Sequence, residues 1–292
     1  MMKRRIEKMK LGVISDCFKR PMAESIALAG ALGLEGIQMY AVGGDICPDT
    51  LLENEEKLSE YKALLAKHGL IVSALCGDLG GHGFERAGEN PERIEKTKRI
   101  VDLAVAFGTK VVTTHIGVIP EDKSSEKYRT MLAALKECGA YAASRGVTLA
   151  IETGPEIAPV LNDFVNLAGE GVGVNLDPAN FVMVTGQDPA EAVRLIGKKI
   201  VHTHLKDGKM LKKSDPLEIY NHFADGGIEA LNVADYFIET PVGEGDVDFA
   251  AYIGALKEIG YDGFLTIERE TGADPSADIK NAAEYAKANF AL

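Results

Sequence analysis

The chain has 292 residues, 46% hydrophobic residues and a formal net charge of −12. This size and composition suit one large α/β domain or two small ones with an ordinary apolar core. The acidic balance disfavours nucleic acid as a partner, and no segment approaches the ~18 consecutive apolar residues of a membrane helix.

Short apolar segments alternate along the chain with longer amphipathic ones. Asn90-Pro91 and Asp188-Pro189 are typical helix starts, because proline fits the first turn of a helix. The short segments predict strands at Leu11–Cys17, Gly36–Tyr40, Ile71–Cys76, Val111–His115, Thr148–Glu152, Gly173–Asp177, Ile200–His204 and Gly263–Glu268. The longer ones predict helices at Met22–Leu32, Thr50–His68, Pro91–Phe107, Ser125–Arg145, Ile157–Leu167, Pro189–Gly197, Asp248–Ile259 and Ala277–Phe290.

Eight such units at a spacing of roughly thirty residues match an α/β fold with a single (β/α)8 barrel. An open, doubly wound sheet is the alternative. We expect one domain over residues 1–292, with a short flexible basic N-terminus at about 1–9. A long loop insertion after strand seven, at about 207–247, breaks the repeat. Such a connection either covers a substrate or is a plain surface insertion.

Four predicted strands end in a side chain that can bind a metal: Glu152, Asp177, His204 and Glu268. Buried carboxylates are costly unless they are paired or coordinate an ion, so equivalent positions indicate one centre. Strands in an open sheet lie about 4.8 Å apart, and four strand ends would then spread over about 14 Å. A closed barrel directs them at a common point, which favours the barrel over the open sheet.

Each of these residues also has an alternative role. Glu152 could pair with a neighbouring lysine or arginine, and Asp177 could cap the turn at Pro178. Alternation along the strand places His202 on the same face as His204, and Glu270 on the same face as Glu268. A carboxylate-rich site with one imidazole suits one divalent ion, Mn²⁺ or Mg²⁺, with Zn²⁺ or Co²⁺ as alternatives.

The order and spacing of five motifs resemble the sugar phosphate isomerase/epimerase branch of the xylose-isomerase-like TIM barrels, over nearly the whole chain. That branch includes D-tagatose 3-epimerase-like enzymes, hydroxypyruvate isomerase and inosose dehydratase, and endonuclease IV is a more distant relative. The motifs are Ile151-Glu152-Thr153-Gly154-Pro155-Glu156, Asn175-Leu176-Asp177-Pro178-Ala179-Asn180, His202-Thr203-His204-Leu205-Lys206-Asp207, Gly243-Glu244-Gly245-Asp246 and Thr266-Ile267-Glu268.

The resemblance implies that Glu152, Asp177, His204 and Glu268 hold the metal, and that Glu152 and Glu268 are also catalytic. In the epimerases the equivalent glutamates pass the proton of the substrate carbon through a metal-stabilised enediolate. We therefore expect an isomerase or epimerase of a sugar, sugar phosphate or related hydroxy-carbonyl compound. A dehydratase of a keto-cyclitol or keto-sugar is the alternative, ahead of a metal-dependent phosphodiesterase like the AP endonucleases or a non-catalytic sugar-binding module.

Four further residues are candidates for substrate binding: His115, Asn180, Lys206 and Glu156. Lys206 could hold a phosphate or a hydroxyl, or form a surface salt bridge, and Glu156 could instead start the next helix. Many members of the family have a histidine where this chain has Asn180. Because asparagine is a poor metal ligand, this departure favours one metal ion over several.

The four cysteines are scattered and form no Cys-x-x-Cys pair. This pattern is typical of reduced thiols in a cytoplasmic protein. The basic start is followed by no apolar run, so it does not read as a secretory signal. Neither a membrane nor a nucleic acid is an expected partner, whereas a homo-oligomer is compatible with the barrel fold.

Overall fold

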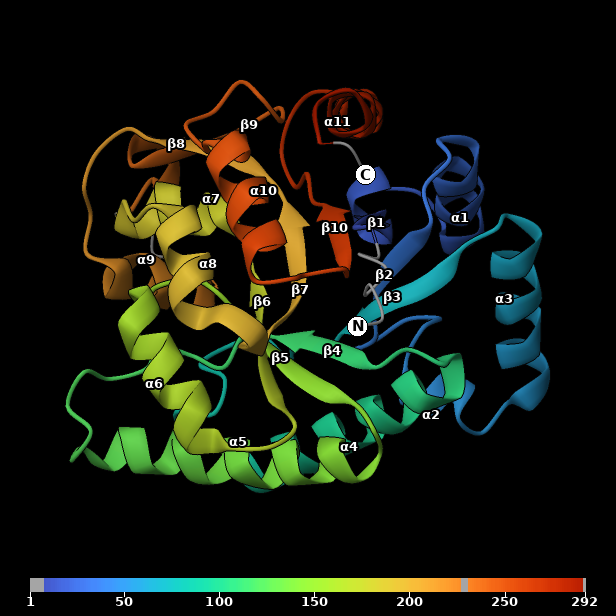
Figure 1. Cartoon of the computed structure of the whole chain (residues 1–292). Helices are drawn as coiled ribbons and strands as arrows, with labels where there is room; N and C mark the ends of the chain where they lie inside the picture. Colours follow the sequence, from blue (N-terminus) through green and yellow to red (C-terminus); the bar gives the residue numbers. More distant parts are fainter. Residues whose placement is uncertain (1–7, 227–230, 291–292) are drawn as a thin grey trace, which may run out of the picture.

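Eight parallel strands close into a barrel in the computed structural model, which describes residues 8–226 and 231–290. The barrel order is β1-β10-β7-β6-β5-β4-β3-β2, with helices arranged around the strands (Figure 1). The prediction of a (β/α)8 barrel is therefore confirmed, and most of the predicted flexible N-terminus lies outside the described residues. The barrel strands are β1 Lys10–Ile14, β2 Gly36–Tyr40, β3 Ile71–Cys76, β4 Val111–Thr114, β5 Thr148–Glu152, β6 Val172–Leu176, β7 Ile200–Leu205 and β10 Phe264–Ile267.

The helices follow the strands in chain order, as a β/α repeat requires. None of them, within the described part of the chain, is both long and apolar enough to cross a bilayer. They are α1 Met22–Ala31, α2 Pro48–Leu51, α3 Glu55–Lys67, α4 Asn90–Phe107, α5 Glu126–Ser144, α6 Ala158–Ala168, α7 Pro178–Asn180, α8 Pro189–Ile196, α9 Pro216–Ala224, α10 Phe249–Glu258 and α11 Pro275–Asn289.

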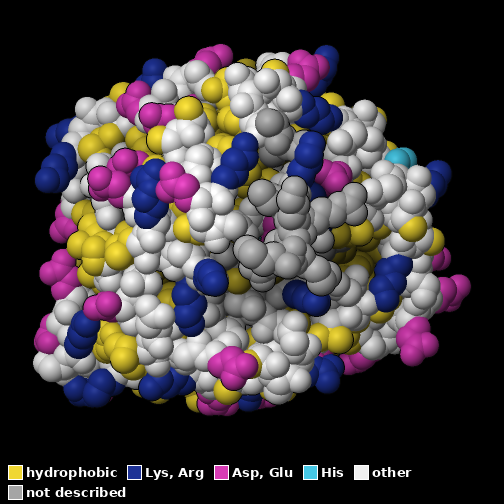
Figure 2. Space-filling model, viewed as in Figure 1, with side chains coloured by type: hydrophobic (Ala, Val, Ile, Leu, Met, Phe, Trp, Pro, Cys, Tyr) yellow, Lys and Arg dark blue, Asp and Glu magenta, His cyan; other side chains and the backbone are white. Residues whose placement is uncertain are grey.

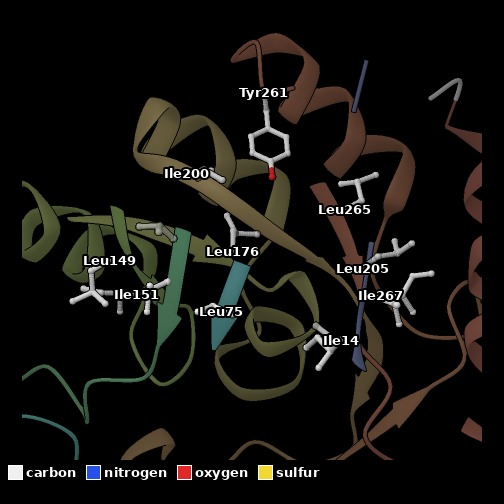
Figure 3. Close-up of a cluster of buried hydrophobic side chains, with 14 of the residues drawn as sticks. Ile14, Leu75, Leu149, Ile151, Leu176, Ile200, Leu205, Tyr261, Leu265 and Ile267 are labelled. Carbon is white, nitrogen blue, oxygen red and sulfur yellow. The ribbon is translucent and has the colours of Figure 1, made fainter. Parts of the chain in front are cut away.

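Apolar side chains of the barrel strands form the core. Ile151, Leu205 and Ile267 are almost completely buried. This is expected from strand alternation, because each of them is the sequence neighbour of a predicted ligand and therefore lies on the other face of its strand. The ring of Phe264, the first residue of β10, lies in the space that a Cβ on Gly36 would occupy. Figure 3 shows part of this core, including Ile14, Leu75, Leu149, Ile151, Leu176, Ile200, Leu205, Tyr261, Leu265 and Ile267.

Two predicted elements differ from the structure. The first strand was expected to continue to Cys17, but it ends at Ile14 and passes into a 3₁₀ turn at Ser15–Phe18. The single helix predicted over Thr50–His68 is wrong, because α2 and α3 are separate helices. The side chain of Asn54 accepts a hydrogen bond from the backbone N–H of Lys57 and so begins α3 as an N-cap.

The insertion after β7 has structure of its own. It contains an antiparallel hairpin of β8 (Asp207–Met210) and β9 (Phe237–Thr240), with α9 between the two strands. The helix begins at an Asp215-Pro216 pair, whose aspartate accepts from the N–H of Leu217. That start signal is visible in the sequence, but its helix is short and was not predicted.

Asp207 fixes the return of the insertion to the barrel. Its Oδ2 accepts hydrogen bonds of 2.9 Å from the N–H groups of Gly243 and Gly245. Its Oδ1 accepts from Gly208 at 2.9 Å and from Val247 at 3.2 Å. A Cβ on Gly245 would overlap the carboxylate. The Gly-Glu-Gly-Asp motif therefore has a structural reason, which is the close approach of its backbone to a buried aspartate.

The outer surface carries both signs of charge. Figure 2 shows lysine and arginine side chains interspersed with aspartate and glutamate on one face of the molecule. Such a mixture is typical of a solvated surface and differs from the basic stripe that follows a phosphate backbone.

Candidate metal centre and active site

The four predicted ligands lie together at the carboxyl ends of the barrel strands. Glu152 ends β5, Asp177 follows β6, His204 lies in β7 and Glu268 follows β10. All four are buried, and each offers a ligand atom within 4.8 Å of those of the others. The structure thus brings the set together, while its role as a metal centre stays a prediction.

The imidazole of His204 faces the three carboxylates through one nitrogen. Its Nδ1 lies 2.7 Å from Glu268 Oε2, 3.4 Å from Asp177 Oδ2 and 3.5 Å from Glu152 Oε1. Its other nitrogen, Nε2, lies 3.3 Å from the amide oxygen of Gln38 and 3.1 Å from Nδ2 of Asn175. Burial opposes the charge of His204, but Glu268 and Glu152 outweigh it and raise the pKa of the imidazole well above its usual value. Loss of the Nδ1 proton when an ion binds, with Nε2–H still donated to Gln38, would direct the Nδ1 lone pair at the space between the carboxylates.

A buried polar network holds these groups in place. Asn175 donates from Nδ2 to Glu152 Oε2 at 3.2 Å, and its Oδ1 accepts from His202 Nδ1 at 2.9 Å. The hydroxyl of Thr266 lies 3.0 Å from His202 Nε2. Burial, and then the charge of His204, lower the pKa of His202, which is therefore neutral. His202 therefore belongs to this supporting network.

The donor set fits a divalent cation. Glu268 Oε2 is buried and has no hydrogen-bond partner, although it lies 2.7 Å from His204 Nδ1. The two atoms form an ion pair with each other and therefore face the same space. Asp177 uses Oδ1 to accept from the N–H groups of Ala179 and Asn180, which leaves Oδ2 for the centre. Asp177 is therefore both a turn cap and a member of the cluster.

The charges of the cluster are strongly coupled. Burial opposes ionisation of Asp177, but Lys206 and His204 outweigh it and hold the pKa of Asp177 below its usual value. Burial likewise opposes ionisation of Glu152, whose pKa is lowered by His204 and His115. For Glu268 burial prevails and raises the pKa to about 7. The two glutamates are thus shifted in opposite directions, as is usual for an acid and base pair.

His115 and Asn180 lie on the wall of the same cavity as the cluster. The Nδ1 of His115 is 3.0 Å from Asp78 Oδ2, and its Nε2 is 3.9 Å from Glu152 Oε1. Asn180 donates from Nδ2 to the carbonyl of Thr153 at 3.0 Å. Both residues therefore line the cavity, while their role in substrate binding stays a prediction.

Lys206 and Glu156 lie differently from each other. Lys206 is buried in the cavity wall, so the surface salt bridge considered for it is not what the structure shows. Its Nζ is 2.8 Å from Glu270 Oε2 and 3.4 Å from Glu268 Oε1. Glu156 is buried as well and accepts from the N–H of Ile119 at 2.7 Å. It is not among the described residues that line the cavity, so its substrate-binding role stays a prediction.

The cavity has a volume of about 770 Å³ and opens beside the insertion. Three members of the cluster, Glu152, His204 and Glu268, form part of its polar end, and Gln38, His115 and Lys206 line it beside them. The other end is lined by side chains of the insertion and of the turn at Phe181–Thr185. The insertion therefore contributes to the cavity wall, while the role of covering a substrate stays a prediction.

Several residues of the site were not predicted from the sequence. Gln38, Asp78, Tyr220 and Glu239 all line the cavity, and Asn175 supports Glu152. A signal existed for two of them: Gln38 is a lone polar residue in an apolar strand, and Asn175 alternates with Asp177. The positions of Tyr220 and Glu239 follow only from the folding of the insertion.

The chain is similar to proteins that act on sugars and cyclitols. A family model described as "Xylose isomerase-like TIM barrel" matches residues 26–289. The L-ribulose-5-phosphate 3-epimerase UlaE of Escherichia coli is 26% identical over 92% of this chain and 89% of that protein. An inosose dehydratase of Clostridium perfringens is 26% identical over 56% of this chain and 52% of that enzyme. The uncharacterized protein YfiH of Bacillus subtilis is 23% identical over 96% of this chain and 98% of that protein.

Solved structures show the same fold. A xylose isomerase domain protein from Planctomyces limnophilus has a TM-score of 0.76 at 26% identity, covering 97% of this chain and 96% of that one. The IOLI protein, solved with a bound zinc atom, has a TM-score of 0.71 at 20% identity and covers 96% of each chain.

Proposed function

The chain belongs to the xylose isomerase-like TIM barrel family, and we propose that it is a divalent-metal-dependent isomerase or epimerase. Its substrate would be a sugar, a sugar phosphate or a related hydroxy-carbonyl compound. The observation that carries the proposal is the buried set of Glu152, Asp177, His204 and Glu268, whose ligand atoms lie within 4.8 Å of one another. Relatives that are named as an epimerase and a dehydratase support an enzyme of this kind.

These four residues would hold the ion, for which Mn²⁺ or Mg²⁺ suits the three carboxylates and Zn²⁺ or Co²⁺ suits the imidazole. When bound, the ion would polarise the substrate carbonyl and stabilise the negative charge that develops on its oxygen. Gln38 holds the ring of His204 through Nε2, and Asn175 holds Glu152. The protein thus fixes the orientation of its ligands through buried amide groups.

Glu152 and Glu268 would move the proton. They come from β5 and β10, which are separated in the barrel by β6 and β7, so they reach a bound carbon from different sides. One carboxylate removes the proton next to the carbonyl, and the electron pair of the C–H bond moves toward the carbonyl. Return of a proton by the second glutamic acid inverts the carbon, which is epimerisation. Return to the neighbouring carbon is isomerisation.

The test is hydrogen exchange from heavy water into ketoses and ketose phosphates, with Mn²⁺ supplied. Glu152→Gln and Glu268→Gln each remove a base, so we expect deuterium incorporation to fall by about 10²–10⁴-fold. Glu258→Gln, at an exposed glutamate that pairs with Arg194, is the matched control and should leave incorporation unchanged. Unchanged incorporation in both active-site variants would refute this mechanism.

A dehydratase is the second candidate, because the relatives include an inosose dehydratase. The same two carboxylates could remove a proton and protonate a departing hydroxyl. Mass spectrometry of the product distinguishes the two reactions, since dehydration lowers the mass by one water and isomerisation leaves it unchanged. We also propose a cytoplasmic enzyme, in keeping with the free thiols of Cys17, Cys47, Cys76 and Cys138.

A further inference from the structure

We propose that the substrate is an unphosphorylated hydroxy-carbonyl compound that carries a bulky apolar substituent. This inference rests on the proposed function and concerns the part of the cavity that the proton transfer does not use. Two features of the cavity wall carry it: an apolar end built by the insertion, and the scarcity of cations available to bind a phosphate.

The apolar end is the part of the cavity wall that is formed by elements outside the barrel strands. It combines the turn after α7 with α9 and β9, two elements of the insertion. Phe223 is 58% exposed and Ile238 is 39% exposed, although both line the cavity. An apolar cavity surface that remains in contact with water is typical of a ligand site. Its main apolar side chains are Met183, Val184, Ile219, Phe223, Phe237 and Ile238.

The size of the cavity agrees with a substrate larger than a simple sugar. Its volume of about 770 Å³ lies in the upper part of the range of about 300–1,000 Å³ that is typical of sites for drug-sized ligands. A free ketose held between Glu152 and Glu268 would fill the polar end and leave the apolar end in water. A substituent on the sugar would reach that end and bury it.

The charges of the cavity disfavour a phosphate. Among the described residues that line it, Lys206 is the only lysine or arginine. Its Nζ already lies 2.8–3.9 Å from carboxylate oxygens of Asp177, Glu239, Glu268 and Glu270. A phosphate dianion would have to approach these carboxylates, whereas phosphate sites usually provide arginine, lysine or free backbone N–H groups.

The histidines of the cavity wall are engaged in the same way. His82 Nε2 lies 2.8 Å from Asp225 Oδ1. His115 Nδ1 lies 3.0 Å from Asp78 Oδ2, and its other nitrogen faces Glu152. Each thus already has a carboxylate as its partner. The cavity therefore favours neutral and apolar groups next to its polar end.

A matched set of ligands tests this specificity by calorimetry on the full chain with Mn²⁺ present. The ligands are 6-O-benzyl-D-fructose, 6-O-methyl-D-fructose and D-fructose 6-phosphate. The 1-O-benzyl and 1-O-methyl ethers of D-fructose form a second matched pair. We expect at least one benzyl ether to bind about tenfold more tightly than its methyl partner, because it buries an aromatic ring. The phosphate should bind no more tightly than the methyl ether.

Variants locate the effect. Phe223→Ser and Ile238→Ser change side chains that are already exposed, so the fold should persist. Each variant should reduce the benzyl preference, which is the ratio of the affinities for the benzyl and the methyl ether, severalfold. Binding of the methyl ether should stay unchanged. Leu217→Ser is the matched control on α9, because Leu217 is 42% exposed and lies outside the described cavity lining. This variant should keep the full preference.

Several results would overturn the inference: equal binding of benzyl and methyl ethers at both positions, binding of none of the ligands, tightest binding of the phosphate, or a benzyl preference that survives in both cavity variants. Failure of the proposed function has a different signature. In that case the benzyl preference persists, but no ketose, with or without a benzyl group, incorporates deuterium from heavy water.

Discussion

Lys206 is a buried cation among carboxylates, and its replacement by methionine tests the charge balance of the site. Its Nζ lies 3.4 Å from Glu268 Oε1, 3.8 Å from Glu239 Oε2 and 3.9 Å from Asp177 Oδ2. At an effective dielectric constant of about 20, each contact near 4 Å is worth about 4 kcal/mol. The contact with Glu270 at 2.8 Å counts for less, because that carboxylate is 55% exposed.

The sum of these attractions is offset by the desolvation of the buried charges, which costs several kcal/mol for each ion. Removal of the lysine keeps the cost of burying the carboxylates and loses their attraction to Nζ. Breaking such a buried pair typically costs about 3–5 kcal/mol. We therefore expect Lys206→Met to lower the free energy of unfolding of the metal-stripped protein by about this amount.

Urea unfolding followed by circular dichroism measures the loss. Lys123→Met is the control, because Lys123 forms an ion pair with Asp163 in which both side chains are more than half exposed. The control should change stability by about 1 kcal/mol or less. Lys206→Met should also bind Mn²⁺ about tenfold more tightly or better, since a competing positive charge is removed from the cluster. A loss of stability below about 1 kcal/mol, or weaker Mn²⁺ binding, would contradict the reasoning.

Three more predictions concern the surroundings of the site. Gln38→Leu removes the acceptor for His204 Nε2, so Mn²⁺ affinity should fall about 10–100-fold in a chelator competition assay; an unchanged affinity would argue against this role. Asp207→Ala leaves four backbone N–H groups without their acceptor, and the free energy of unfolding should fall by about 3 kcal/mol. Asp207→Asn, which keeps one acceptor oxygen, should lose less. Burial raises the pKa of Glu156 from 4.5 to about 7, so the folded state holds this proton more tightly than the unfolded state does. The stabilisation is full below pH 4.5 and is lost as the pH rises through 7. Glu156→Gln should remove that part of the pH dependence in unfolding titrations between pH 4.5 and 7; equal slopes for variant and parent would contradict the shift.

Local sequence information was sufficient for the barrel and for the residues at its strand ends. Alternation along a strand has a period of two, so the side chains that face the barrel interior can be read from any one strand. Glu152, Asp177, His204 and Glu268 stand at equivalent ends of their strands, and parallel strands bring such ends to one rim. The same reasoning placed His202 beside His204, but its bonds to Asn175 and Thr266 could not be read from one strand.

The tertiary structure alone decided how the cluster is supported and what covers it. Gln38 reaches His204 across the barrel, and the two residues are separated by 166 positions in the chain. The insertion has little periodicity, so its hairpin and its short helix could not be predicted from local spacing. The bonds of Asp207 fix the returning backbone, and the folded insertion brings Phe223 and Ile238 to the cavity wall. The sequence by itself therefore determined which side chains the strands present to the site. Their partners, and the shape of the space above them, depend on contacts between distant segments, which local spacing does not encode.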